Sequence, residues 1–265
     1  MKNFYDIFPR KKIVIGMVHL KPLPGSPNFE GDLEQVYESA LQDLKAIEAG
    51  GAHGAIVENF SDVPYTTENS LETVLSMTAI VAGLKREATI PIGVNFQFNC
   101  AKEEIAIAYV CGAEFIRVEA FVENRMGPFG LTLAKAPELM RYRAKLGAKT
   151  LIFADINVKH TYPMTSQDLS LDLKETVSAG ADAIIVTGLQ TGQNPSVDEV
   201  KFVKRCAPDV PLLVGSGVTA ENVSSLLEYA DGIIVGSYIK KDGIVKNPVD
   251  PERVRHLVEE VKRMR

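Results

Sequence analysis

The sequence predicts a single α/β domain, a (β/α)8 or TIM barrel, from its length, its alternating segments and its helix ends. The chain has 265 residues, and this fold typically needs about 250. Short runs rich in Val and Ile alternate with longer amphipathic segments, as buried parallel strands alternate with helices. Glycine ends several of the helical segments, at Gly112, Gly147 and Gly180 for example, where it fits a left-handed backbone. No linker-like stretch interrupts the alternation, so we expect one domain over residues 1–265.

The order of the elements favours a closed barrel over an open sheet. Eight strands are expected, at residues 13–18, 55–58, 92–96, 115–118, 151–156, 183–187, 212–214 and 232–235. Helical spacing is found at residues 33–49, 71–86, 133–146, 169–179 and 197–206, and Asp250-Pro251-Glu252 begins a last helix. A doubly wound open sheet shares the alternation, but it carries a Gly-x-Gly-x-x-Gly turn after its first strand. Here Met17-Val18-His19-Leu20-Lys21-Pro22 stands at that place, so the barrel is preferred.

Composition excludes several classes of partner. The chain has 29 basic and 34 acidic residues, a net charge of -5, and no dense Lys/Arg run, so nucleic acid is not an expected partner. No apolar run approaches the roughly 18 residues of a membrane span, so we expect no integral membrane segment. The three cysteines are isolated, which is typical of a reducing compartment. Together with the absence of a signal-like start, this predicts a cytoplasmic protein. We also expect a homo-oligomer, because barrels of this kind often form one.

Two glycine turns give the sharpest local signal. Gly215-Ser216-Gly217 follows the seventh expected strand, and Gly236-Ser237 follows the eighth. In TIM barrels the loops at these two places commonly bind phosphate, because glycine lets backbone N–H groups approach an anion. The alternative is that both are simple turns that close the barrel. Two turns in the right places favour a phosphate site, so the expected partner is a phosphorylated small molecule.

Polar side chains gather where the expected strands end, which is the catalytic face of this fold. The catalytic candidates are His19, Glu58, Glu119 and Asp155. The candidates for substrate binding are Asn59, Asn95, Arg117, Asn157, Lys159 and Thr187.

The roles of these residues stay open at this point. Paired carboxylates suit general acid–base chemistry, and Glu58, Glu119 and Asp155 could instead share a divalent metal, although no ligand spacing identifies one. The alternative is a buried polar network in which Arg117 and Lys159 neutralise the carboxylates. A Schiff base on Lys159 is less favoured, because this residue lies in a loop beyond its strand.

Two loops on the same face are unusually long, at residues 19–32 and 120–132. Long loops on a catalytic face often act as lids or binding loops. Phe121, Phe129 and Leu131 are compatible with covering a substrate or with contact to a partner subunit.

Several stretches together resemble the BtpA family, a set of barrel proteins named for a link to photosystem I assembly. They are residues 15–27, residues 51–60, Pro91-Ile92-Gly93-Val94-Asn95, Phe115-Ile116-Arg117-Val118-Glu119, residues 154–160 and the Gly215-Ser216-Gly217 turn. The resemblance spans nearly the whole chain and implies the barrel fold. Some members of the family are described as sugar-metabolism or nucleoside-related proteins, and the phosphate site is similar to that of ribulose-phosphate-binding barrels.

The leading hypothesis is an enzyme, a lyase, isomerase or hydrolase, that acts on a phosphorylated sugar or nucleoside-like compound. The glycine turns would hold the phosphate, and the carboxylates would carry out acid–base chemistry at the other end. The alternatives are a non-catalytic assembly factor that uses the barrel's exterior, and a sensor that binds a phosphorylated ligand without turnover.

Overall fold

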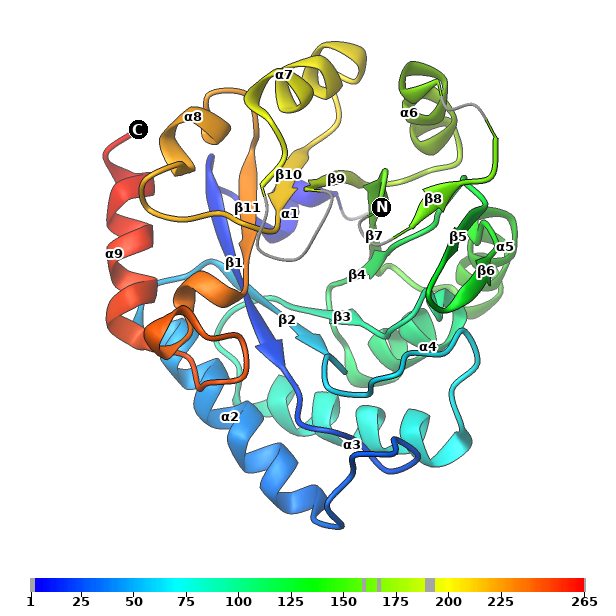
Figure 1. The fold of residues 1–265 in the computed structure, drawn as a ribbon, viewed down its shortest axis with the longest axis vertical. Helices are drawn as coiled ribbons and strands as arrows, with labels where there is room; N and C mark the ends of the chain where they lie inside the picture. Colours follow the sequence, from blue (N-terminus) through cyan, green and yellow to red (C-terminus); the bar gives the residue numbers. More distant parts are fainter. Residues whose placement is uncertain (1–2, 159–160, 166–167, 189–193, 265) are drawn as a thin grey trace.

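A closed barrel of eight parallel strands forms the centre of the molecule in the computed structural model, which describes residues 3–158, 161–165, 168–188 and 194–264 (Figure 1). The strands run around it in the order β1-β11-β10-β9-β7-β4-β3-β2. Their bounds are β1 (Ile13–His19), β2 (Gly54–Glu58), β3 (Ile92–Asn95), β4 (Phe115–Val118), β7 (Leu151–Ile156), β9 (Ala183–Thr187), β10 (Leu212–Gly215) and β11 (Gly232–Val235). The predicted barrel is confirmed, and each strand lies within one residue of its expected bounds.

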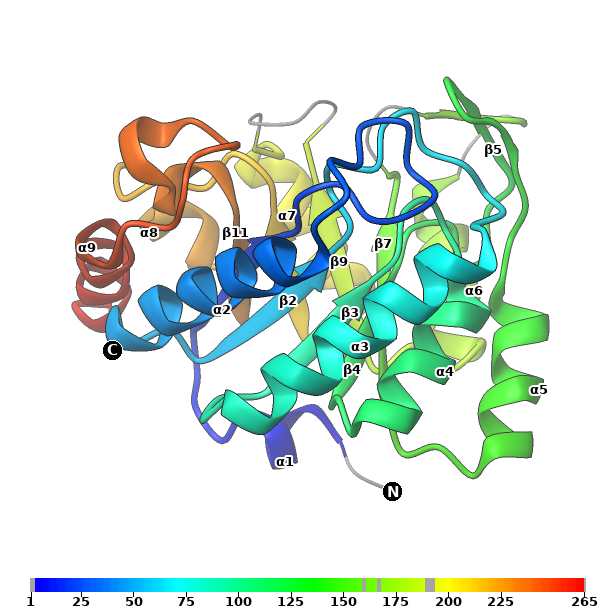
Figure 2. The same cartoon turned by 90° about the horizontal axis from the view of Figure 1, so that it is seen from below.

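Helices cover the outside of the barrel, and Figure 2 shows α2 to α5 along one side of it. They are α1 (Phe4–Ile7), α2 (Leu33–Ala49), α3 (Leu71–Glu87), α4 (Ala101–Cys111), α5 (Ala136–Leu146), α6 (Leu169–Ser178), α7 (Val197–Cys206), α8 (Val223–Leu227) and α9 (Pro251–Lys262), with 3-10 turns η1 (Ser237–Ile239) and η2 (Lys241–Gly243). The expected start of α5 at residue 133 was wrong. The chain is still in a strand up to Thr132, and Pro137 then occupies the first turn of the helix, a position that Pro favours.

The barrel interior is filled by alternate residues of the strands. On β1 these are Ile13, Ile15 and Met17, because successive side chains of a strand point to opposite faces. The rings of Phe115 and Phe153 stack inside the barrel with centroids 4.5 Å apart. This apolar column supports the polar layer above it.

The N-terminal segment closes the bottom of the barrel, where Figure 2 shows α1 at the end opposite the long loops. Phe4 lies 5.6 Å from Phe153, and Phe8 lies 5.9 Å from Phe115, between ring centroids. Both residues are 2% exposed. With these described residues in place, a ligand would enter the barrel at the other end, where the long loops lie.

A small antiparallel sheet stands at the mouth of the barrel, in the region expected to be a long loop (Figure 2). It contains β5 (Arg125–Gly127), β6 (Gly130–Thr132) and β8 (Tyr162–Pro163), in the order β6-β5-β8. At its tip Phe129 stacks on Phe98 with centroids 4.3 Å apart. Phe121 is buried, whereas Leu131 is half exposed.

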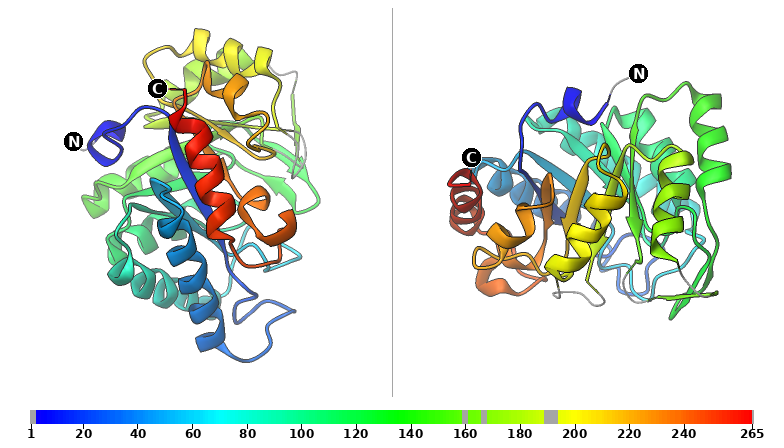
Figure 3. Two further views of the ribbon diagram at one scale, coloured as in Figure 1. Left: turned by 90° about the vertical axis from the view of Figure 1, so that its left-hand side faces the viewer. Right: turned by 90° about the horizontal axis from the view of Figure 1, so that it is seen from above.

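The loop after β11 is fastened to the outer helices. Lys240 Nζ lies 2.5 Å from Asp43 Oδ2 of α2, and Val249 N donates to Asp43 Oδ1 over 2.7 Å. Figure 3 shows α9, which follows this loop, running alongside β1 and α2. The contact fixes the backbone that follows Gly236.

Among the helices that the structure describes, none combines the length and the apolar character that crossing a membrane requires.

Candidate active site

A polar layer caps the apolar interior at the carboxyl ends of the strands. His19 is in register with Glu58, and Glu58 with Asn95. Because inward positions alternate along each strand, the inward residues that continue the interior column are His19, Glu58, Asn95, Arg117, Asp155, Thr187, Gly215 and Gly236. The sequence candidates on these eight strand ends therefore face one another across the barrel mouth.

One cavity joins the two halves of the predicted site. It is lined by both glycine turns and by side chains from β1, β2 and β4, including Ser216, Gly217, Gly236, Ser237, His19, Glu58, Phe60 and Arg117. Its volume of about 50 Å³ is room for a few water molecules. The larger part of a metabolite would therefore lie over the mouth, above this cavity.

The backbone of the glycine turns keeps the cavity open. Ser216 and Gly217 have φ angles of 65° and 61°, a left-handed conformation that suits glycine and is uncommon for other residues. A Cβ on Gly236 would lie 3.0 Å from His19 Cε1. The Asn222 side chain braces the first turn, because it accepts from Thr219 N and donates to Gly217 O, each over 2.9 Å.

His19 is held by a ring contact at the cavity wall. Its imidazole stacks on Phe60 with centroids 4.2 Å apart and an interplanar angle of 20°. Both rings line the cavity, and Glu58 lies beside His19 on the neighbouring strand. His19 and Glu58 thus place an imidazole and a carboxylate at the same edge of the cavity.

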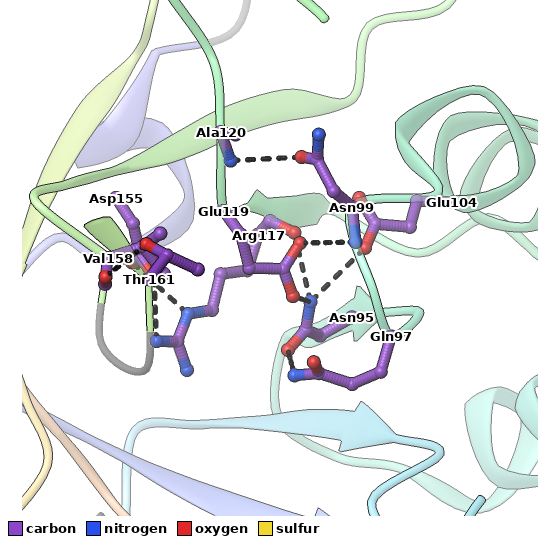
Figure 4. A network of polar contacts seen from close by, with 10 residues as sticks. All are labelled: Asn95, Gln97, Asn99, Glu104, Arg117, Glu119, Ala120, Asp155, Val158 and Thr161. Atoms are coloured by element: carbon purple, nitrogen blue, oxygen red, sulfur yellow. Dashed lines mark hydrogen bonds and ion pairs between the residues drawn. The ribbon is translucent and has the colours of Figure 1, made fainter. Parts of the chain in front are cut away.

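Arg117 and Asp155 form a buried ion pair below the mouth (Figure 4). Arg117 Nε donates to Asp155 Oδ1 over 3.2 Å, and Nη2 donates to Oδ2 over 2.8 Å. Burial alone lowers the pKa of Arg117, but Asp155 and neighbouring carboxylates outweigh it, so the pKa is raised. The guanidinium thus stays charged at the cavity, and Asp155 serves to orient it.

Glu119 lies in a network with Asn95 and Asn99, away from the cavity lining (Figure 4). Asn95 Nδ2 donates to Glu119 Oε1 over 2.8 Å, and Asn99 N donates to Oε2 over 3.0 Å. Burial raises the pKa of Glu119 to about 7, against the opposing effects of Asn95 and Arg117. A carboxyl group with this pKa can take up or release a proton near neutral pH.

The remaining predicted residues occupy different places. Asn59 is buried behind the cavity, where its Oδ1 accepts from Gln97 N over 2.6 Å and its Nδ2 donates to Asp62 Oδ2 over 3.0 Å. Asn157 Oδ1 accepts from Arg125 Nη2 over 3.0 Å, so this residue supports the small sheet.

The Thr187 hydroxyl is buried and has no hydrogen-bond partner in the described part of the chain. Lys159 lies outside the described residues.

The three carboxylates do not converge as a shared metal site. Within the described residues, no group of three His, Cys, Asp or Glu side chains has an arrangement that could hold a metal ion. Asp155 faces Arg117, and Glu119 faces Asn95. Asp155 and Glu119 therefore belong to two separate hydrogen-bonded pairs.

Sequence reasoning missed two residues of this region, Glu104 and Arg125. Glu104 lies on α4 and contacts Asn95, and Arg125 is a buried member of β5 that contacts Asn157, Thr161 and Glu123. Glu104 carried a usable signal, because it shares a helix face with Ala101, Ile105 and Ala108. A carboxylate in an apolar helical stripe indicates a buried partner.

Comparison with known proteins agrees with this architecture. The model of the BtpA family matches residues 10–263. The chain belongs to the BtpA family. An uncharacterized protein of Archaeoglobus fulgidus is 43% identical over 253 residues, covering 95% of this chain and 99% of that protein. The photosystem I biogenesis protein BtpA of Synechocystis is 37% identical over 259 residues, covering 97% of this chain and 90% of that protein.

This BtpA-family chain is also similar in fold to solved structures. The N-(5'-phosphoribosyl)anthranilate isomerase of Pyrococcus furiosus superposes with a TM-score of 0.57 and 16% identity, covering 95% of this chain and 99% of that one. At this identity the likeness concerns the fold, which is that of TIM-barrel enzymes.

Proposed function

We propose that this protein is an enzyme that acts on a phosphorylated sugar or nucleoside-like compound. The observation that carries the proposal is the single cavity lined by both glycine turns and by His19, Glu58 and Arg117. Phosphate sites in TIM barrels commonly lie at the loops after the seventh and eighth strands, which here are β10 and β11. The named substrate of the structurally similar isomerase also carries a phosphate.

The chemistry would take place at the part of the cavity wall that β1, β2 and β4 form, where His19 adjoins the Gly236 turn. Glu58 and His19 are the groups at the cavity that can move a proton, and Arg117 can stabilise negative charge that develops on a substrate oxygen. Asn95 and Asp155 hold Arg117 and Glu119 in place. Thr187 supplies a hydroxyl at the end of β9 that has no hydrogen-bond partner among the described residues. This set of groups suits isomerisation or carbon–carbon cleavage through proton abstraction.

A binding experiment tests the phosphate site directly. Titration calorimetry with ribose 5-phosphate and with ribose should show that the ester binds at least about tenfold more tightly, a difference of about 1.4 kcal/mol. Equal affinity for the two compounds, across a panel of sugar phosphates, would contradict the site.

A solvent-exchange experiment tests the chemistry. With a bound phosphate ester in deuterated water, proton abstraction should place deuterium on a substrate carbon, detectable by NMR. Glu58→Gln should slow this exchange by about 10²–10⁴-fold, the usual contribution of a positioned acid–base group, while ester binding is retained. Binding without exchange or turnover in the unaltered protein would instead support a phospho-ligand sensor.

A second function, in assembly, is favoured by one surface feature. Met126 of β5 lies opposite Leu131 on one side and Tyr162 on the other, and the three residues are 51%, 49% and 76% exposed. Side chains paired in this way share one face of the sheet, and an exposed apolar face of this kind marks protein contacts. The name of the Synechocystis relative refers to photosystem I biogenesis. If this face forms contacts between copies of the chain, light scattering should show a lower molar mass for Met126→Lys than for the unaltered protein. If it binds another protein, Met126→Lys should lose that binding.

A further inference from the structure

Glu104 is a buried carboxyl group to which the proposed mechanism assigns no task. It lies on α4, is 0% exposed and forms no ion pair with Lys or Arg in the part of the chain that the structure describes. Its Oε1 accepts from Phe96 N over 2.6 Å and from Asn95 Nδ2 over 3.2 Å. Its Oε2 is buried without a hydrogen-bond partner among the same residues. An ionised carboxylate with one orphaned oxygen would carry a large desolvation cost here.

Glu119 contacts the same Asn95 amide as Glu104, but neither of its oxygens lacks a hydrogen bond. Both of its oxygens accept hydrogen bonds, from Asn95 Nδ2 over 2.8 Å and from Asn99 N over 3.0 Å. Asn95 Nδ2 thus faces both carboxyl groups and lies closer to Glu119 (Figure 4). Two adjacent buried carboxyl groups resist ionising together, and the group with both oxygens hydrogen-bonded is the better place for the negative charge.

We propose that Glu104 is a positioning residue that retains a proton on Oε2 at neutral pH, so that the negative charge of the pair, when it forms, resides on Glu119. The neutral Glu104 fixes the Asn95 amide by accepting from it, and Asn95 in turn orients the Glu119 carboxylate. This assignment does not depend on the proposed function, which gives Glu119 no step.

The surrounding groups favour a proton on Glu104 and a negative charge on Glu119. Burial first, and then the charge of Glu119, hold the pKa of Glu104 well above its usual range, and Glu103 acts in the same direction. Burial raises the pKa of Glu119 to about 7, Asn95 and Arg117 oppose the rise, and Asp155 adds to it. Two further groups nearby, Cys100 and Tyr65, have raised pKa values and stay neutral. Glu119 therefore titrates near neutrality while Glu104 keeps its proton.

Infrared spectroscopy of the full-length protein tests the proposal without a substrate. At about pH 8, where ordinary carboxyl groups are ionised and Glu119 is largely so, the spectrum should retain the C=O band of a protonated carboxylic acid. Glu104→Gln, which preserves size and the acceptor for Phe96 N, should remove that band. The matched control Glu103→Gln, one position away on the same helix, should keep it. A band that persists in Glu104→Gln, or is missing from the unaltered protein, would overturn the proposal.

Carbon-13 NMR of the unaltered protein with labelled glutamate gives a reading that does not depend on folding of the variant. The side-chain carboxyl carbon of Glu104 should keep its protonated shift through about pH 8, while that of Glu119 moves with a midpoint near 7. A Glu104 shift that moves together with those of surface glutamates would contradict the proposal. Loss of phosphate-ester binding would affect the proposed function alone, because neither spectrum needs a ligand.

Discussion

At the scale of single residues, the partners of each buried polar group of the mouth decide how it behaves. Asp155 and Glu119 come from neighbouring strands and are equally inaccessible to solvent, yet they differ in partner. Asp155 has the Arg117 guanidinium, which offsets the cost of its charge. Glu119 has amide donors from Asn95 and Asn99, which offset that cost only partly. Asp155 therefore supports Arg117 through an ion pair, whereas Glu119 titrates near neutrality.

The raised pKa of Glu119 predicts a dependence of stability on pH. The pKa rises from 4.5 to about 7 on folding, so the folded protein holds this proton more tightly than the unfolded chain. The resulting stability is fully present below pH 4.5 and is lost as the pH rises through about 7, a difference on the order of 3 kcal/mol. Glu119→Gln should remove this component. Urea unfolding of both proteins between about pH 4 and pH 9 measures it, and parallel pH profiles would contradict the assignment.

At the scale of elements, the loops after β10 and β11 owe their shape to supports outside the site. Asn222 braces the first loop. The buried Lys240–Asp43 pair ties the second loop to α2. The small sheet is fixed at the opposite rim by Arg125, whose guanidinium contacts Asn157 and Thr161. A substitution of one of these supporting residues would change the shape of the cavity, although none of them lines it.

Gly236→Ala should weaken binding of a phosphate ester much more than it weakens the fold. The added Cβ would lie 3.0 Å from His19 Cε1, inside the cavity. We expect about a tenfold or greater loss of affinity by calorimetry.

Gly54→Ala is the matched control for this change. Its Cβ would meet Phe8 Cε1 at the same 3.0 Å, but at the closed end of the barrel. It should lower thermal stability and leave ester affinity unchanged. If both variants lose affinity alike, Gly236 does not act through the cavity.

At the scale of the whole molecule, the barrel is closed at one end and open at the other (Figure 2). Phe4 and Phe8 complete the interior from below, although they precede the first strand. The polar layer and the small sheet lie at the mouth. This polarity confines any chemistry to the carboxyl ends of the strands.

Phe8→Ala should therefore destabilise the protein without altering its site. Phe8 is 2% exposed and packs against Phe115, so its truncation should cost about 3–5 kcal/mol. Tyr5→Ala is the control, because Tyr5 is 53% exposed and its loss should change the free energy of unfolding far less. Denaturant unfolding together with ester titration would show whether stability falls while affinity is kept.

The barrel, the places of its strands and the positions that face the mouth could all be predicted from the residue pattern. The periodic apolar runs and glycine helix ends are local signals, and an inward position at a strand end follows from the period of two. His19, Glu58, Asn95 and the glycine turns could be chosen on that basis. Their chemical roles stayed predictions.

Only the tertiary structure decided which polar groups pair. Asp155 meets Arg117, Asn59 turns to Asp62, and Glu104 reaches Asn95 from a helix outside the barrel. The small sheet likewise joins β5 to β8 across a long sequence separation. Such contacts depend on distances between separate elements, and no local periodicity encodes them. The charge of a buried carboxylate follows from those contacts, so the fold and not the local sequence pattern sets it.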